Sequence, residues 1–233
     1  MGTDMYFYGS VLAILVRTIL PGPAEDNLEQ VWQEIKAAYK DMRISSQFQN
    51  MKLSMFERGE RFPMLKGKGA EVRHLGRPLL KVFEQRMDAE NRQHKQIKMA
   101  LEFSVQIEEI LDVHEDLYAL PTDAAKELSD ACYAFCGLVT AIGRHYHDAG
   151  IQYFNFTIKS HYLLHIALLS MVVNPRLAWC YKGEDFMQIV KKIIAASVRG
   201  TPAYAVEAKT LRKYANGLNL KFRPEECYLR TAL

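Results

Sequence analysis

Apolar residues recur at helical spacing along most of this chain, and breaks containing Pro or Gly separate one run from the next. Leu28, Val31 and Ile35, for example, lie on one face of a predicted helix. The sequence does not alternate predicted strands with predicted helices, as a chain that forms a parallel sheet would. The sequence therefore predicts an all-α protein, a multi-helix orthogonal bundle of about seven to nine helices. At most one short strand is expected, near 151–158, where aromatic and β-branched residues are frequent.

The breaks also place the individual helices and the ends of the fold. We expect one helical domain over 1–233, in which 1–24 form an apolar helix and a Pro-Gly-Pro turn, and 221–233 form a loose tail. A shorter helix is expected within 45–64. The other predicted helices cover 6–20, 26–42, 70–87, 91–118, 122–147, 160–173, 184–198 and 204–215.

Three local signals refine these boundaries. Asp26 followed by Glu29 has the spacing of a capping box, which predicts that Asp26 is an N-cap. Pro78 is expected to kink or restart the helix that contains it. Asn216 and Gly217 are the expected end of the last helix, because Gly commonly follows a helix C-terminus.

Composition restricts the class of protein more than its function. The net charge is +3 over 233 residues, so nucleic-acid binding is compatible with the sequence but not required by it. Four scattered cysteines do not form a disulfide framework, and no secretory signal is present, so we expect an intracellular protein, nuclear or cytoplasmic. The apolar run 11–20 contains Arg17 and is too short to cross a bilayer, so no membrane partner is expected.

Two pairs of metal-ligand residues share one spacing. His161 and His165 lie four residues apart, on one helix face, but Tyr162 stands where the zinc-helix motif has Glu. Cys132 and Cys136 repeat the spacing on another helix. The histidines therefore serve either as metal ligands or in packing and hydrogen bonding. The cysteines either complete a Cys2His2 set with them or are buried free thiols.

Acidic and basic residues leave similar alternatives open. Glu184, at the start of a predicted helix, either complements the helix dipole or is a ligand for Mg²⁺, the one cofactor that the sequence suggests without requiring it. Two basic sets either contact phosphates or form solvated faces. These sets are Lys66, Lys68, Arg73, Arg77 and Lys81, and Lys191, Lys192, Arg199, Lys209, Arg212 and Lys213.

Three segments resemble a known family. Lys68–Leu75 (KGAEVRHL) is similar to a KAAE-x-R segment, and Lys159–His165 (KSHYLLH) to a K-x-H-x-L-x-H segment, of some eukaryotic transposases. The stretch 174–187 is similar to the acidic segment that follows. Over roughly 25–220, the chain resembles the C-terminal helical region of DDE/RNase H-like cut-and-paste transposases in the Kyakuja–Dileera–Zisupton style, as found in algal and dinoflagellate genomes.

The resemblance implies a role near DNA. In such enzymes carboxylates position Mg²⁺ for attack on a phosphodiester, and Glu184 would be the third acid. Lys159, His161 and His165 would lie near that site or the DNA. The strands that carry the first two aspartates are absent from this sequence. We therefore expect a remnant or C-terminal part of a mobile-element protein, catalytically incomplete as an isolated chain, with weak nucleic-acid binding.

Two other functions stay open at the level of the residues. One is a helical protein-interaction module with a protein partner and no nucleic-acid role, which would use helix faces such as that of Trp32. The other is a metal-dependent enzyme that would use His161, His165 and Glu184.

Overall fold

The computed structural model describes residues 2–178 and 181–231, and the side chains of 178, 181–185, 188 and 220–231 lie outside that description. The structure is 72% helical, with eight α-helices and no strand among the described residues, so the predicted all-α bundle is confirmed. The chain divides into two compact units, Met1–Ala178 and Trp179–Leu233, which we describe separately. One domain over the whole chain stays a prediction.

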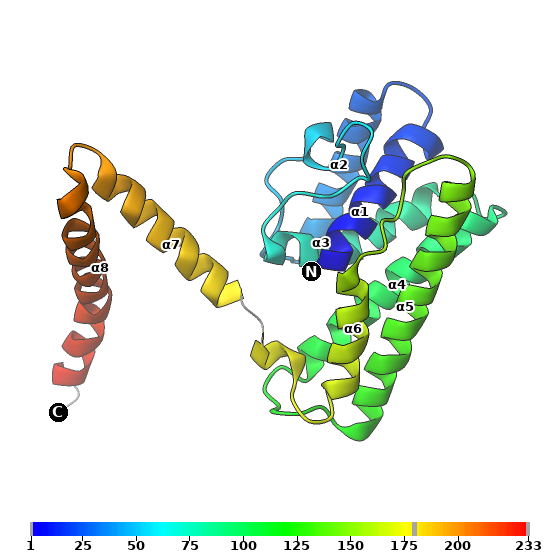
Figure 1. Cartoon of the computed structure of the whole chain (residues 1–233). Helices are drawn as coiled ribbons and strands as arrows, with labels where there is room; N and C mark the ends of the chain where they lie inside the picture. The colour runs from blue at the N-terminus through cyan, green and yellow to red at the C-terminus, as the bar shows by residue number, and fades with distance from the viewer. Residues whose placement is uncertain (1, 179–180, 232–233) are drawn as a thin grey trace. The chain divides into compact units, whose positions relative to one another are not determined.

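The first unit is built around its N-terminal helix. Its helices are α1 (Gly2–Ile14), α2 (Ala24–Asp41), α3 (Gly69–Arg86), α4 (Arg92–Val113), α5 (Thr122–Asp148) and α6 (Ile158–Leu169). The long helices α4 and α5 pack along each other, and α5 also contacts α6 (Figure 1). Helix α1 packs against α3 and α6, and every residue over 7–16 is buried. The apolar N-terminal run therefore forms the core. No helix in the described part of the chain has the length and hydropathy to cross a membrane.

Two close approaches hold α1 in place. The hydroxyl of Tyr8 lies 2.7 Å from the Ser104 hydroxyl on α4, which satisfies both groups inside the core. This contact is close to Gly76 on α3, where an added Cβ would come 2.5 Å from the Tyr8 hydroxyl. An added Cβ at Gly9 would come 2.8 Å from the amide nitrogen of Leu65. Both glycines are therefore required by the packing around α1.

The turn from α1 to α2 differs from the prediction. Helix α1 passes into a π-helical turn, Leu15–Ile19, and α2 begins at Ala24 after Pro23. The prediction that Asp26 is an N-cap is wrong, because the N-cap position is occupied by Pro23, three residues earlier. Asn27, which is buried, donates from Nδ2 to the carbonyl oxygens of Val16, Leu20 and Gly22. Asn27 therefore supplies hydrogen-bond donors to carbonyl oxygens at the end of the π-helical turn.

The connection from α2 to α3 is a long packed loop. It contains only a 3-10 turn, Leu53–Met55, in place of the shorter helix that the sequence predicts within 45–64. Two backbone bonds pair its halves: the amide of Met64 donates to Phe56, and that of Lys66 to Met55. The side chains of Phe56 and Leu65 are fully buried. The loop is therefore held against the core at its base, and 57–63 form its tip.

The remaining connections of the first unit follow from local capping. Asn91 Oδ1 accepts from the amides of Gln93 and His94 at the start of α4, as a side-chain N-cap does. Helix α3 continues through Pro78 as one element. The segment 151–157 contains no strand and includes Phe154 at a φ of 57°. The 3-10 turn Pro175–Ala178 ends the unit.

The second unit is a pair of helices, α7 (Tyr181–Val198) and α8 (Ala203–Thr231), joined through Gly200 at a φ of 66°. The rings of Phe186 and Tyr214 lie 5.9 Å apart across the pair. The prediction that Asn216 and Gly217 end the last helix is wrong, since α8 continues past them into 221–231, for which the sequence predicts a loose tail. An interior Gly costs a helix only about 1 kcal/mol.

Candidate functional site

Arg73, which the sequence groups with Lys66 and Lys68, does not face solvent. Its side chain on α3 is 8% exposed and forms ion pairs with Glu108 and Asp112 of α4. Lys66 and Lys68 are exposed at the end of the α2–α3 loop. We therefore remove Arg73 from the phosphate contacts, because its guanidinium already binds two carboxylates. Lys66 and Lys68 stay predicted contacts.

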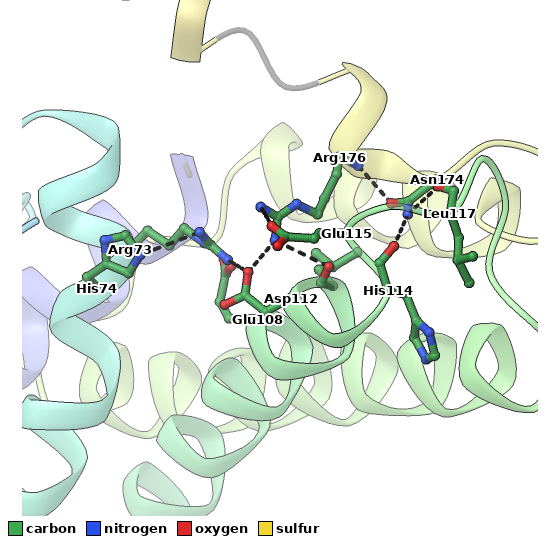
Figure 2. Close-up of polar contacts among 10 residues, drawn as sticks. Arg73, His74, Glu108, Asp112, His114, Glu115, Leu117, Asn174 and Arg176 are labelled. Carbon is green, nitrogen blue, oxygen red and sulfur yellow. Dashed lines mark hydrogen bonds and ion pairs between the residues drawn. The ribbon is translucent and has the colours of Figure 1, made fainter. Parts of the chain in front are cut away.

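Arg73 belongs to a chain of alternating charges, which we call the ionic network (Figure 2). Oδ1 of Asp112 accepts from both Arg73 and Arg176. The other end of the Arg176 guanidinium lies 2.8 Å from Oε2 of Glu115. The network, Glu108, Arg73, Asp112, Arg176 and Glu115, joins α3, α4 and the 3-10 turn that ends the first unit. Its geometry is that of a structural clamp.

Burial controls the electrostatics of this network. Burial raises the pKa of Glu108 above its usual value, and the charge of Arg73 opposes that shift. A cavity of about 100 Å³ beside the network is lined by Tyr8, His74 and Glu108, among others. Burial, with the charge of Arg73, lowers the pKa of His74. A partly buried carboxylate paired in this way joins two helices, and the small cavity beside it leaves little room for a substrate.

Asn174 fastens the same end of the unit. Its buried Nδ2 donates to the carbonyl oxygens of His114, at 2.7 Å, and Leu117, at 2.9 Å (Figure 2). Its backbone amide donates to the carbonyl oxygen of Tyr118. Its Oδ1 accepts from the amide of Arg176, at 3.0 Å. Asn174 therefore ties the α4–α5 connection to the turn that carries Arg176.

An open cavity of about 720 Å³ lies on another part of the first unit. It is formed by the end of α1, the tip of the α2–α3 loop and the segment 150–153. Its charged and polar lining includes Arg17, Glu57, Arg58, Glu60, Arg61, Gln152 and Tyr153. The volume is in the range of small-molecule sites, and the lining is rich in arginine. We call this cavity the arginine cavity.

Arg17 reaches the arginine cavity from the π-helical turn. Nε and Nη2 of Arg17 donate to the two carboxylate oxygens of Glu57, at 2.8 and 2.9 Å. This fork geometry fixes the loop tip against α1 and neutralises both side chains. π-helical turns inside helices are frequent at functional sites. Here the turn places Arg17 outward, while Leu15 and Val16 stay buried.

Arg58 and Arg61 lie on a tight turn around Gly59, whose φ is 64°. Neither arginine forms an ion pair with a residue that the structure describes. The guanidinium of Arg58 lies 3.5 Å from the sulfur of Met64. Since Arg17 and Glu57 neutralise each other, the cavity keeps two cations against one further carboxylate, that of Glu60. This arrangement can bind an anion.

Sequence reasoning missed Arg58 and Arg61, although a local signal exists. The stretch 42–68 contains six Lys and Arg against two Asp and Glu, a net charge of +4, while the whole chain carries +3. Long loops without regular structure are commonly functional in compact domains. A charge count taken per segment would therefore have identified this loop.

His161 and His165, for which the sequence leaves open either metal ligation or hydrogen bonding, form a hydrogen-bonded pair on α6. Nε2 of His161 and Nε2 of His165 lie 2.9 Å apart on α6, and both side chains are exposed. No group of three or more His, Cys, Asp or Glu side chains within the described ranges could hold a metal ion. Of the two alternatives for the cysteines, the structure does not support the Cys2His2 set among these residues. Cys132 and Cys136 on α5 are buried free thiols, and burial raises the pKa of Cys132 to about 12.

The other predicted site residues are spread over both units. Lys159 is exposed in the first turn of α6. Lys191, Lys192 and Arg199 are exposed on the second unit. Glu184 lies within the first turns of α7, and its side chain falls outside the described residues. These residues therefore stay predictions for phosphate or metal contact.

Comparison of this chain with known proteins gives no match. No protein-family model, no curated protein and no solved structure matches this chain.

Proposed function

We propose that this chain binds nucleic acid through the α2–α3 loop and the arginine cavity, as a catalytically incomplete helical part of a mobile-element protein. One observation carries the proposal: Arg58 and Arg61 stand beside an open cavity of about 720 Å³ without a carboxylate partner among the described residues. Unneutralised arginines at a concave surface attract phosphates.

The loop supports a continuous contact with a phosphodiester backbone. Its two halves are paired by the bonds from Met64 to Phe56 and from Lys66 to Met55. The tip therefore carries Arg58 and Arg61, and the base carries Lys66 with Lys68 shortly after it. Because the base is packed on the core, little ordering entropy is lost on binding. Contacts of this kind neutralise phosphates and give affinity with little sequence preference.

A metal-dependent enzyme has less support. The histidine pair supplies two nitrogen ligands, and no third ligand joins them among the residues described. Catalysis by Mg²⁺ needs several oxygen ligands at one place. We therefore propose binding and no reaction for the isolated chain.

The test is fluorescence anisotropy with labelled duplex and single-stranded DNA over a salt series. We expect affinity to fall steeply with salt. The variant carrying Arg58→Ala and Arg61→Ala should bind more weakly, and its slope of log affinity against log salt for duplex DNA should shrink by about 1.8, or about 0.9 per lost phosphate contact.

Arg77→Ala is the matched control. Arg77 is an exposed arginine of the first basic set, but it lies outside the loop and already forms an ion pair with Glu109, at 2.9 Å. This variant should bind DNA as the unchanged chain does. Equal binding by the double loop variant and the unchanged chain, or binding that salt does not weaken, would refute the proposed function.

A further inference from the structure

The first unit has another open cavity, of about 300 Å³, that the function proposed above does not use. Residues of α5, of the tip of the α2–α3 loop and of the segment 153–156 line it. Aromatic rings are frequent in this lining, which includes Phe62, Tyr153, Phe154 and Phe156, and we call it the aromatic cavity. Its volume lies at the lower end of the range of small-molecule sites, so it is large enough for one planar group.

Two of these aromatic rings are accessible to a ligand. Phe156 is 45% exposed, and Phe62 is partly buried. Neither of them forms a ring contact with a residue that the structure describes. Tyr153, by contrast, lies edge-on to Tyr146 with 5.3 Å between the ring centroids, and Phe154 is only 3% exposed. Phe62 and Phe156 therefore provide the ring faces on which a ligand can stack.

The segment that carries Phe156 is fixed by contacts on two sides. It passes beside α1, where the amide of Phe154 donates to Oγ of Ser10, at 2.9 Å (Figure 1). On the side of α5, an added Cβ at Gly143 would come 2.9 Å from the carbonyl oxygen of Phe154. Phe154 has a φ of 57°, which a bulky side chain rarely adopts, and such strained residues are frequent at ligand sites. Because these contacts already order the segment, little entropy is lost when a ligand binds.

The aromatic cavity also carries positive charge. Arg144 on α5 lines it and is exposed, and it forms no ion pair with a carboxylate that the structure describes. His147, three residues further along α5, is exposed in the same lining. The described residues that line the cavity include no Asp or Glu. A ligand that joins a planar ring to negative charge therefore matches this cavity better than an apolar side chain of a protein does.

The aromatic cavity adjoins the arginine cavity. Tyr153 lines both of them. In the loop tip, Arg61 lines the arginine cavity, and the next residue, Phe62, lines the aromatic cavity. Because consecutive Cα atoms are about 3.8 Å apart, a phosphate bound at Arg61 lies close to a ring stacked on Phe62. A nucleotide has these two groups, a phosphate and a planar base, joined in one molecule.

A base enters such a cavity only when it is unpaired, because a duplex stacks and pairs its bases internally. Proteins that bind single strands combine a basic surface with aromatic rings on which bases stack. We propose that the two cavities together bind single-stranded nucleic acid, with phosphates at Arg58 and Arg61 and one unpaired base stacked against Phe62 and Phe156. This inference rests on the nucleic-acid binding proposed above and names the class of nucleic acid that the site binds.

The test compares labelled oligonucleotides of about ten nucleotides by fluorescence anisotropy, with the full chain. One is oligothymidylate, and the other has the same number of phosphates but abasic sites in place of the bases. Oligothymidylate should bind at least about fivefold more tightly, because a stacked base adds to the phosphate contacts. Oligouridylate of the same length, in the same assay, distinguishes RNA from DNA as the preferred strand.

Phe156→Ala separates base stacking from phosphate contact. It should weaken the binding of oligothymidylate at least about fivefold, with the same salt slope, since no phosphate contact is lost. Its affinity for the abasic strand and for duplex DNA should stay unchanged, which also shows that the variant is folded. Phe156→Tyr keeps an aromatic ring and should bind as the unchanged chain does. Tyr133→Ala, which removes a 50% exposed ring of α5 outside the cavity, is the matched control.

Two results would overturn this inference and leave the proposed function intact. The first is equal binding of the abasic strand and oligothymidylate. The second is equal affinity of Phe156→Ala and the unchanged chain for oligothymidylate. Either result would mean that the arginines bind phosphates alone and that the aromatic cavity serves another ligand. Absence of any salt-dependent binding to all of these nucleic acids would refute the proposed function, and this inference with it.

Discussion

The ionic network and the arginine cavity contain the same residue type in opposite roles. In the network Arg73 is 8% exposed and binds Glu108 and Asp112. In the cavity Arg58 and Arg61 have no such partner among the described residues. The difference comes from the neighbouring element. Arg73 faces a helix with carboxylates one turn apart. In the turn that carries Arg58 and Arg61, Arg17 already binds Glu57, and Glu60 forms no ion pair with either arginine among the described residues. An arginine near other basic residues in a sequence is therefore not by itself a phosphate contact.

The largest expected effect is on the free energy of unfolding, and it comes from Arg73→Met, which removes one of the two arginines of the ionic network. This variant should destabilise the fold by up to about 3 kcal/mol, because the partly buried carboxylate of Glu108, whose side chain is 25% exposed, loses its compensating charge. Urea unfolding followed by circular dichroism measures this loss. Arg77→Met, which breaks an exposed pair with Glu109, should cost less than about 1 kcal/mol. Similar losses for both variants would show that the network is not a buried clamp.

Asn174→Ala tests the hydrogen bonds that link the α4–α5 connection to the turn carrying Arg176. It should cost about 1–3 kcal/mol, because the carbonyl oxygens of His114 and Leu117 lose their donor and Asn174 is fully buried. The same unfolding measurement applies. DNA affinity of the folded protein should stay unchanged, and a coincident loss of affinity would mean that the two regions are not separate.

Glu57→Gln tests the arginine cavity by removing one of its negative charges. It frees Arg17 from its ion pair, so the arginine cavity gains one unneutralised cation. Affinity for duplex DNA should rise, with the salt slope larger by about 0.9, while stability changes by less than about 1 kcal/mol since the pair is exposed. Anisotropy over the salt series measures the first effect. Weaker binding would instead mean that Arg17 serves only to hold the loop.

The smallest expected effect is a dependence of stability on pH from His94. Burial lowers the pKa of His94, against the opposing charge of Asp88, and Nδ1 accepts from the Asp88 amide at 3.0 Å. Because the unfolded chain then takes up a proton more readily, stability should fall as the pH drops through about 6.5.

Thermal unfolding between about pH 7.5 and about pH 5.5 measures this effect. His94→Gln keeps an acceptor for the Asp88 amide but does not titrate, so its melting temperature should depend less on pH. An equal dependence in both proteins would assign the titration to other groups.

The sequence by itself determined the helices, because helical periodicity, caps and breakers act over a few residues. It therefore predicted the all-α class, the apolar N-terminal helix and the shared face of His161 and His165. It misplaced the start of α2, where Pro23 fixes the first turn before Asp26. It also misplaced the end of α8, where a single interior Gly costs too little to stop a helix.

Only the tertiary structure decided which charges are available. Arg73 meets its carboxylates on a helix 35 residues away, and Arg58 lies near Arg17 only because the loop folds back on α1. Such contacts depend on packing between distant segments, which local patterns do not specify. The shared helix face of His161 and His165 follows from their spacing in the sequence. Whether Cys132 and Cys136 join them depends on tertiary packing, which buries the thiols on α5 and leaves the imidazoles exposed.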